Sequence, residues 1–313
     1  AEPVQKRTKN FHAMKADPCR LEQTVLTIVE GYPFRDFLHP QILDQVADYI
    51  HGRLKSCGGR TCYQDFKPGG AGADNRFRNV LSEFGPEDGP RVVVGAHYDV
   101  CGYDAEGRLS DEPMPGADDN ASAVAGLLEL ACVFKDKPPP LRVELAAYSQ
   151  EEPPFFGTPG MGSAVHSRSL KESNAKVLGM ICLEMIGFFS DEPNSQKFPL
   201  PFLKHFYPTT ANFISVVGKL GQGGFVRRIR NAMKASAGDL DIRSIAAPPI
   251  VQGIDYSDHR NYWKEGYKAV MITDTSFCRN PHYHQITDTP DTLDYQRMAR
   301  VVDGVYNAIL QLG

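Results

Sequence analysis

The sequence predicts an α/β fold: a mostly parallel, mixed central β-sheet with helices on both faces. Two observations lead to this prediction. Short apolar, β-branched runs alternate along the chain with segments of helical periodicity, which is typical of strands joined by helices. The 313 residues contain no repeat, low-complexity tract or inter-domain linker, so we expect a single domain over 1–313.

The first part of the chain predicts a surface segment, a helix and a strand. Residues 1–20 are polar and basic, and we expect them to wrap the surface. The segment 39–58 has apolar residues at helical spacing between a proline and a glycine, which predicts an amphipathic helix. Residues 76–84 are expected to form a strand, and residues 85–89 a turn.

Strands and helices then alternate to the C-terminus. The predicted strands are 91–99, 141–149, 177–188, 213–219 and 268–275. The predicted helices are 120–134, one that opens within 157–167, 223–237 and 292–312. The segment 189–210 is rich in Pro and Phe without a clear period, so we expect an ordered insertion that walls a pocket.

Composition excludes several classes of function. The formal net charge is −4, and no basic stretch predicts a nucleic-acid groove or a polybasic membrane patch. No apolar stretch approaches the roughly 18–20 residues of a membrane helix, so we expect a soluble protein. The sequence leaves the oligomeric state open.

The seven cysteines give a weaker signal about compartment. Cys57 and Cys62 flank a turn-forming "GGRT" and could close a small disulfide loop, and Cys19 could pair with either. The other four stand in or beside apolar runs and are expected to be small buried residues. No Cys-x-x-Cys occurs, which disfavours a thiolate zinc cluster or a redox motif. The Cys57/Cys62 pair and the absence of an initial Met favour a periplasmic or secreted protein over a cytoplasmic one.

A residue type that binds metals stands where each buried strand ends. In chain order these residues are His97 and Asp99, Asp118 and Asp119 before a helix, Glu151 and Glu152, Glu184, and His282 and His284. Because ligands bind beyond the carboxyl ends of the strands in open α/β sheets, these side chains are expected to meet at one edge. Adjacent carboxylates such as Glu151 and Glu152 after a buried strand need a counter-charge, and a pair of metal ions would supply it.

A two-metal centre makes definite demands on its ligands. Two divalent ions about 3.5–4 Å apart need a bridging carboxylate. A mixed set of imidazoles and carboxylates without Cys suits zinc, with manganese or cobalt as alternatives. One carboxylate beyond the ligand set is then free to act as a base.

Six stretches, in order, resemble one known family. They are "GAHYD", "PGADDNASAVAGLLELA", "SQEEPPFFGTPGMGS", "CLEMIGF", "YSDHRNYW" and "YHQITDTPDTLD". Together they make the chain, over roughly residues 75–310, similar to the co-catalytic zinc exopeptidases of the bacterial leucyl-aminopeptidase type. Glutaminyl cyclases and glutamate carboxypeptidase share that fold. The resemblance therefore implies a zinc-exopeptidase sheet.

The resemblance also implies five ligands for two Zn²⁺ ions. They are His97 and Glu184 on the first metal, Glu152 and His284 on the second, and Asp118 as the bridge between both. The better-known members have Asp where Glu184 stands, so the longer side chain can shift the first metal. His282 is an alternative to His284, but the spacing to the following "DT" favours His284.

Further roles follow from the same resemblance. Glu151 is the expected general base on a metal-activated water, and Asp99 is expected to orient His97. Tyr283 is the first candidate for donating to the oxyanion, and Tyr256 is the second. His259 is expected to be structural or pocket-lining.

The expected function is hydrolysis of the N-terminal residue of peptides. A glutaminyl cyclase, an aminoacyltransferase with one zinc, is the alternative, but cyclases enclose the glutamine with tryptophans and this chain has only Trp263. A carboxypeptidase would need a cation for the substrate carboxylate, which Arg260 or Arg279 could supply. A binding module without activity is disfavoured because the base and all five ligand positions are filled. Aromatic residues at 155–156, 188–189 and 198–207 predict an apolar specificity pocket.

Overall fold

Eight strands form one mixed sheet in the computed structural model, which describes residues 16–69, 75–104 and 107–313. The order across the sheet is β1-β2-β4-β3-β5-β8-β6-β7. The strands are β1 (Arg60–Phe66), β2 (Phe77–Phe84), β3 (Arg91–His97), β4 (Arg142–Tyr148), β5 (Val177–Glu184), β6 (Phe213–Lys219), β7 (Asp241–Ala247) and β8 (Ala269–Thr273). The central strands β4, β3, β5 and β8 run parallel, which confirms the predicted fold class.

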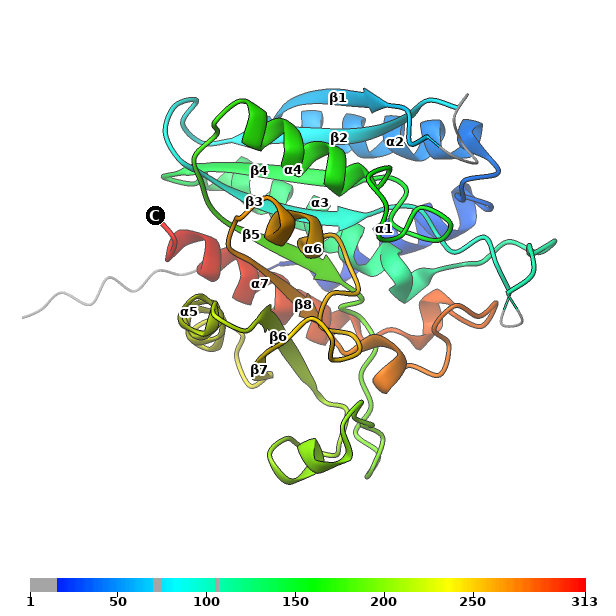
Figure 1. Ribbon diagram of the computed structural model, residues 1–313, viewed down its shortest axis with the longest axis vertical. Coiled ribbons are helices and arrows are strands. Elements are labelled where there is room, and N and C mark those ends of the chain that lie inside the picture. Colours follow the sequence, from blue (N-terminus) through cyan, green and yellow to red (C-terminus); the bar gives the residue numbers. More distant parts are fainter. Residues whose placement is uncertain (1–15, 70–74, 105–106) are drawn as a thin grey trace, which may run out of the picture.

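Helices cover both faces of the sheet. They are α1 (Pro18–Gly31), α2 (Pro40–Ser56), α3 (Ala123–Asp136), α4 (Gly162–Glu172), α5 (Gly223–Lys234), α6 (His259–Lys264) and α7 (Tyr295–Leu310). In Figure 1, α4 and α6 lie in front of the sheet, and α2, α3 and α7 lie behind it. Four short turns of helix, η2 (Ala117–Ser122), η3 (Pro201–His205), η4 (Ser276–Cys278) and η5 (Pro290–Thr292), lie in the connections.

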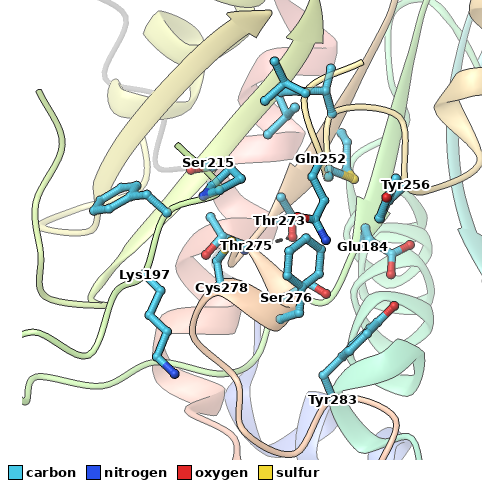
Figure 2. A pocket seen from close by; sticks show the side chains of 18 of the residues that line it. Glu184, Lys197, Ser215, Gln252, Tyr256, Thr273, Thr275, Ser276, Cys278 and Tyr283 are labelled. Atoms are coloured by element: carbon cyan, nitrogen blue, oxygen red, sulfur yellow. Dashed lines mark hydrogen bonds between the residues drawn. The ribbon is translucent and has the colours of Figure 1, made fainter. Parts of the chain in front are cut away.

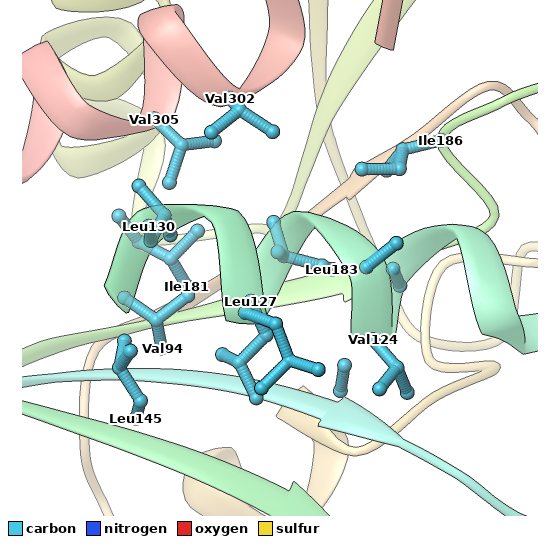
Figure 3. Packing of buried hydrophobic residues seen from close by; sticks show 14 of the residues in the cluster. Val94, Val124, Leu127, Leu130, Leu145, Ile181, Leu183, Ile186, Val302 and Val305 are labelled. Atoms are coloured by element: carbon cyan, nitrogen blue, oxygen red, sulfur yellow. The ribbon is translucent and has the colours of Figure 1, made fainter. Parts of the chain in front are cut away.

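The main core lies between the central strands and α7, with α3 in the middle. Leu127 and Leu130 of α3 pack over Val94 and Ile181 of the sheet, and α7 closes the other side with Val302 (Figure 3). Each of these side chains is almost completely buried, and burial of such a side chain contributes about 1.5–3 kcal/mol. The core therefore fixes the positions of the strand ends that carry the polar residues.

Four elements were not predicted from the sequence: the strands β1 and β7, the helix α1 and the short helix α6. Strands β1 and β7 are the two edges of the sheet, and their side chains are mostly exposed or half-buried, so no apolar run marks them. Helix α1 begins at Pro18, inside the segment expected to wrap the surface, and Asp17 caps it by accepting the Cys19 N–H. The prediction for residues 1–15 lies outside the described residues.

The cysteine arrangement differs from the predicted loop. Cys57 ends α2 and is buried, whereas Cys62 is exposed on the edge strand β1. The Sγ atom of Cys57 lies 3.5 Å from Sγ of Cys132 on α3, and all seven cysteines are free thiols. The expected Cys57–Cys62 pairing is therefore wrong for this structure, because α2 turns Cys57 toward the core.

Among the described residues, no helix has both the length and the apolar character that a membrane span requires.

Candidate metal centre and active site

The first group of potential ligands surrounds the end of β3. Nε2 of His97 lies 3.4 Å from Oδ1 of Asp119 and 3.4 Å from Oε2 of Glu184, which ends β5. Oε2 of Glu151, which follows β4, is 3.9 Å from the same nitrogen. The carboxyl ends of three parallel strands thus bring side chains more than 80 residues apart in sequence to one place, as expected for this sheet.

A second group of potential ligands adjoins the first. Nε2 of His284 lies 3.2 Å from Oδ2 of Asp119 and 3.2 Å from Oε1 of Glu152. Asp119 therefore offers one carboxylate oxygen to each group. His282 is outside both groups, and its Nδ1 is 2.9 Å from Oγ1 of Thr287.

Asp119, and not Asp118, which was predicted as the bridge, is the aspartate that faces both histidines. The Asp118 carboxylate is buried and accepts the Gly187 N–H (2.9 Å) and the Asn280 side-chain amide (2.8 Å), which holds it away from the histidines. The two aspartates are adjacent on a tight turn, so their side chains leave it in different directions. Sequence spacing alone did not identify which of the two faces the histidines.

A distant carboxylate and a glycine build this turn. Asp288 accepts the N–H groups of both Asp118 and Asp119 at 3.0 Å. Gly116 has φ +52°, and a Cβ there would lie 2.3 Å from the carbonyl oxygen of Asp119. Only glycine fits that close approach, so the "PGADD" stretch has a structural reason for its glycine.

The residues fit zinc on geometric grounds. Nε2 of His97 and Oδ1 of Asp119 are buried and make no hydrogen bond with the described part of the chain. Two ligand atoms on one tetrahedral zinc, each about 2.0–2.1 Å from the ion, lie about 3.3 Å apart. The four separations of 3.2–3.4 Å from His97 and His284 to their carboxylates match this value.

The electrostatics also require a cation. Burial raises the pKa of Glu151 well above its ordinary value, and it raises the pKa values of Glu152 and Glu184 as well. Burial alone would lower the pKa of His97, but the surrounding carboxylates, Glu184 first, raise it well above the ordinary value. The site thus favours bound positive charge at the histidines, either protons or metal ions.

Asp99 positions three of the site residues through hydrogen bonds. Its carboxylate oxygens accept the N–H groups of Glu151 (3.2 Å) and Glu152 (3.1 Å), which fixes the turn that carries both acids. Its carbonyl oxygen is 3.1 Å from Nδ1 of His97. A proton donated from Nδ1 leaves Nε2 with a free lone pair toward the carboxylates, the arrangement expected of a metal ligand.

Besides Asp288, two further supporting residues were missed at the level of sequence. Ser257 donates from Oγ to Oε2 of Glu184 at 2.5 Å and orients that carboxylate. Arg35, before α2, is 1% exposed and donates to the Gly116 carbonyl at 2.7 Å. Burial lowers the pKa of Arg35 to about 10, while Asp288 and Asp119 oppose that change, so the guanidinium remains charged behind the acids. Arg35 lies in no motif, and although Ser257 stands in the "YSDHRNYW" stretch, nothing in that stretch predicts its contact with Glu184.

The tyrosines expected near the site lie on the same cavity. The Tyr283 ring stacks on that of His284, with centroids 3.9 Å apart. Figure 2 shows Tyr283 extending toward the side of the cavity where Glu184 lies. Tyr256 lines the cavity too, but it is 42% exposed.

His259 is buried away from the ligand groups, and its Nε2 is 2.8 Å from the Ile254 carbonyl.

A cavity of about 390 Å³ opens directly from the ligand groups. Its far end is formed by apolar side chains of the sheet and following loops, including Val217, Ile245, Val251 and Met271. The segment 189–210 contributes Gln196, Lys197, Phe198, Pro199, Leu203 and Tyr207. Phe156 also lines the cavity, whereas residues 155, 188 and 189 do not.

Two groups of imidazole and carboxylate side chains at the strand ends of a mixed eight-stranded sheet define a metal-dependent hydrolase of the zinc-exopeptidase fold. Solved structures share the fold: a leucine aminopeptidase precursor from Bacteroides thetaiotaomicron superimposes with a TM-score of 0.72 at 20% identity, covering 95% of this chain and 98% of that one. A glutaminyl cyclase from Fimbriiglobus ruber gives a TM-score of 0.74 at 18% identity over the full length of both chains.

The family follows from the sequence comparison. The model of peptidase family M28 matches residues 79–309, and the chain belongs to that family. The uncharacterized protein YfbL of Escherichia coli is 43% identical over 93% of this chain and 87% of its own length. A probable leucine aminopeptidase of Arthroderma otae is 26% identical over 71% of this chain. The chain spans 55% of that relative's length, and 54% of a probable zinc metalloprotease of Leptosphaeria maculans.

Proposed function

We propose that this peptidase is an aminopeptidase that holds two zinc ions and releases the N-terminal residue of peptides. The observation that carries the proposal is the position of Asp119, whose two oxygens belong to two separate ligand groups. His97 and Glu184 complete one group, and Glu152 and His284 complete the other. When bound, the metal ions supply Lewis acidity that activates water and polarises the scissile carbonyl.

Glu151 is the proposed general base, which transfers a proton from the attacking water to the departing amine. It is buried on the cavity wall beside both groups, and burial raises its pKa well above the ordinary value. A carboxylate with a raised pKa can take a proton from water and later give it to the departing amine. The N–H of Glu151 is held by Asp99, which keeps the side chain in place.

Tyr283 is the proposed donor to the oxyanion. Burial raises the pKa of Tyr283 well above its ordinary value, so the hydroxyl stays protonated at neutral pH. A fixed donor at the cavity wall stabilises the negative charge that develops on the carbonyl oxygen. The stacking on His284 restricts the ring to that wall.

The cavity favours an aminopeptidase over the alternatives. Its apolar end suits an apolar N-terminal side chain. Trp263 is buried in the protein and donates to the Ala269 carbonyl, so it does not supply the aromatic enclosure of a cyclase. A carboxypeptidase would need a cation for the C-terminal carboxylate of its substrate. Arg279 donates to Gln196 and to two backbone carbonyls, and Arg260 pairs with Asp255 at 3.3 Å. Neither arginine is therefore free to bind that carboxylate.

A panel of aminoacyl-nitroanilides, assayed beside cyclisation of glutaminyl peptides, tests the proposal. We expect amine release that is fastest for leucine and other apolar residues and is lost on chelation. Glu151→Gln should lower kcat by roughly 10²–10⁴-fold, whereas Glu172→Gln, at an exposed glutamate ending α4, serves as the matched control. Cyclisation without nitroanilide hydrolysis would instead establish the transferase activity.

A further inference from the structure

One lysine stands on the cavity wall without an acidic partner. Lys197 belongs to the segment 189–210, lines the cavity and is exposed. Its ammonium group forms no ion pair or hydrogen bond with any described residue of the chain. Among the described lining residues it is the only Lys or Arg, while the opposite wall carries four carboxylates.

The backbone of Lys197 is held in place. Its N–H donates to the Cys278 carbonyl at 2.8 Å, and its carbonyl accepts the Gln196 side-chain amide at 2.7 Å. Gln196 is 6% exposed, and its Oε1 accepts two N–H groups of buried Arg279 at 3.0 and 2.8 Å. The base of the lysine side chain is therefore anchored to the core through a buried polar network, although the ammonium group is solvated.

The position of Lys197 relative to the ligand groups indicates which part of a bound peptide it can contact. Figure 2 shows Lys197 and Glu184 on opposite sides of the cavity, with the lysine side chain running away from Ser215. If the N-terminal side chain fills the apolar end and the amine lies at the acids, the rest of the peptide must leave across the exposed part of the wall. Lys197 is the only lysine or arginine among the described lining residues, which makes it the candidate partner for a negative charge on that part of the substrate.

We propose that Lys197 is a specificity-determining residue that binds a carboxylate on the residue after the scissile bond. The inference rests on the proposed aminopeptidase function and names its substrates: dipeptides, whose terminal carboxylate lies there, or peptides with Asp or Glu in second position. An ammonium on an anchored backbone gains a charge-assisted hydrogen bond with such a group. Because the ammonium is solvated, the gain is modest, about 2- to 5-fold in KM.

Matched substrates test this inference. The measured quantity is the ratio of KM for leucylglycinamide to KM for leucylglycine, which isolates the terminal carboxylate. We expect a ratio of about 2–5 in the wild type, close to one in Lys197→Gln and below one in Lys197→Glu. Lys204→Gln, an exposed lysine of the same segment that does not line the cavity, should keep the wild-type ratio. Leucyl-aspartyl-amide against leucyl-asparaginyl-amide separates a side-chain carboxylate from a terminal one.

The inference and the proposed function fail in different ways. A wild-type ratio near one for both pairs, with leucine nitroanilide still hydrolysed, overturns the role of Lys197 and leaves the aminopeptidase in place. Absence of hydrolysis for every substrate overturns the proposed function. Calorimetric binding of leucylglycine and its amide to Glu151→Gln, with and without Lys197→Gln, still measures the carboxylate preference in that case, and equal affinities would overturn the inference.

Discussion

Asp119 faces His97 with one carboxylate oxygen, at 3.4 Å, and His284 with the other, at 3.2 Å. Its neighbour Asp118 is equally buried but accepts hydrogen bonds from Gly187 and Asn280 instead. Two adjacent residues of one type thus have separate tasks. Asp119 joins the two ligand groups, whereas Asp118 connects the turn to the loops that carry Gly187 and Asn280.

Asp118→Ala should lower stability without removing the ligand set. The substitution leaves the Gly187 N–H and the Asn280 amide buried without their acceptor, and each unsatisfied donor costs about 1–3 kcal/mol. We expect a loss of about 2–5 kcal/mol in the free energy of unfolding, measured by urea denaturation. Unchanged stability would contradict the structural role given to Asp118.

His259 should make the fold sensitive to mild acid. Burial lowers its pKa to about 4, from an ordinary 6.5, and its Nδ1 has no acceptor among the described residues. The unfolded chain therefore takes up the proton first, so stability is complete above about pH 6.5 and is lost as the pH falls toward 4. The loss amounts to about 3 kcal/mol from this group.

Urea denaturation between pH 7 and pH 4 measures this contribution. His259→Gln keeps a side-chain donor for the Ile254 carbonyl but does not titrate. The free energy of unfolding of the wild type should fall by more than that of the variant across this range. Parallel curves for the two proteins would show that His259 does not titrate abnormally.

Cys57 and Cys132 are expected to pair when the protein is oxidised. Their sulfur atoms are 3.5 Å apart, and the hydrogen bond from Cys132 lowers the pKa of Cys57 to about 6, so Cys57 is the attacking thiolate. With oxidised glutathione, Cys57 forms a mixed disulfide and releases one glutathione; Cys132 then displaces the second. Peptide mapping should find the Cys57–Cys132 link and lose it in Cys132→Ser. A Cys57–Cys62 link would contradict the structure.

The sequence predicted the central part of the fold and the place of the site. Buried parallel strands produce apolar runs, and the polar residues that end these runs meet at one edge by geometry alone. Edge strands β1 and β7 have too few buried side chains to be visible in the sequence.

Single side chains within the site were harder to predict. The choice between Asp118 and Asp119 depends on a turn fixed by Asp288, which lies 170 residues from Asp118 and 169 from Asp119 along the chain. Arg35 reaches the acids from a loop whose sequence shows no motif. Contacts of this kind exist only after the chain has folded, so no local pattern reports them.

The most direct test of the account measures zinc per chain and leucine release on the same samples. Wild type, Glu151→Gln and Asp119→Asn would be purified in parallel, analysed for metal by mass spectrometry and assayed with leucine nitroanilide before and after chelation and zinc return. We predict two zinc ions per chain in the wild type and in inactive Glu151→Gln, fewer in Asp119→Asn, and activity that follows zinc content. Wild-type turnover without zinc, or two zinc ions retained in Asp119→Asn, would contradict the bridging role of Asp119.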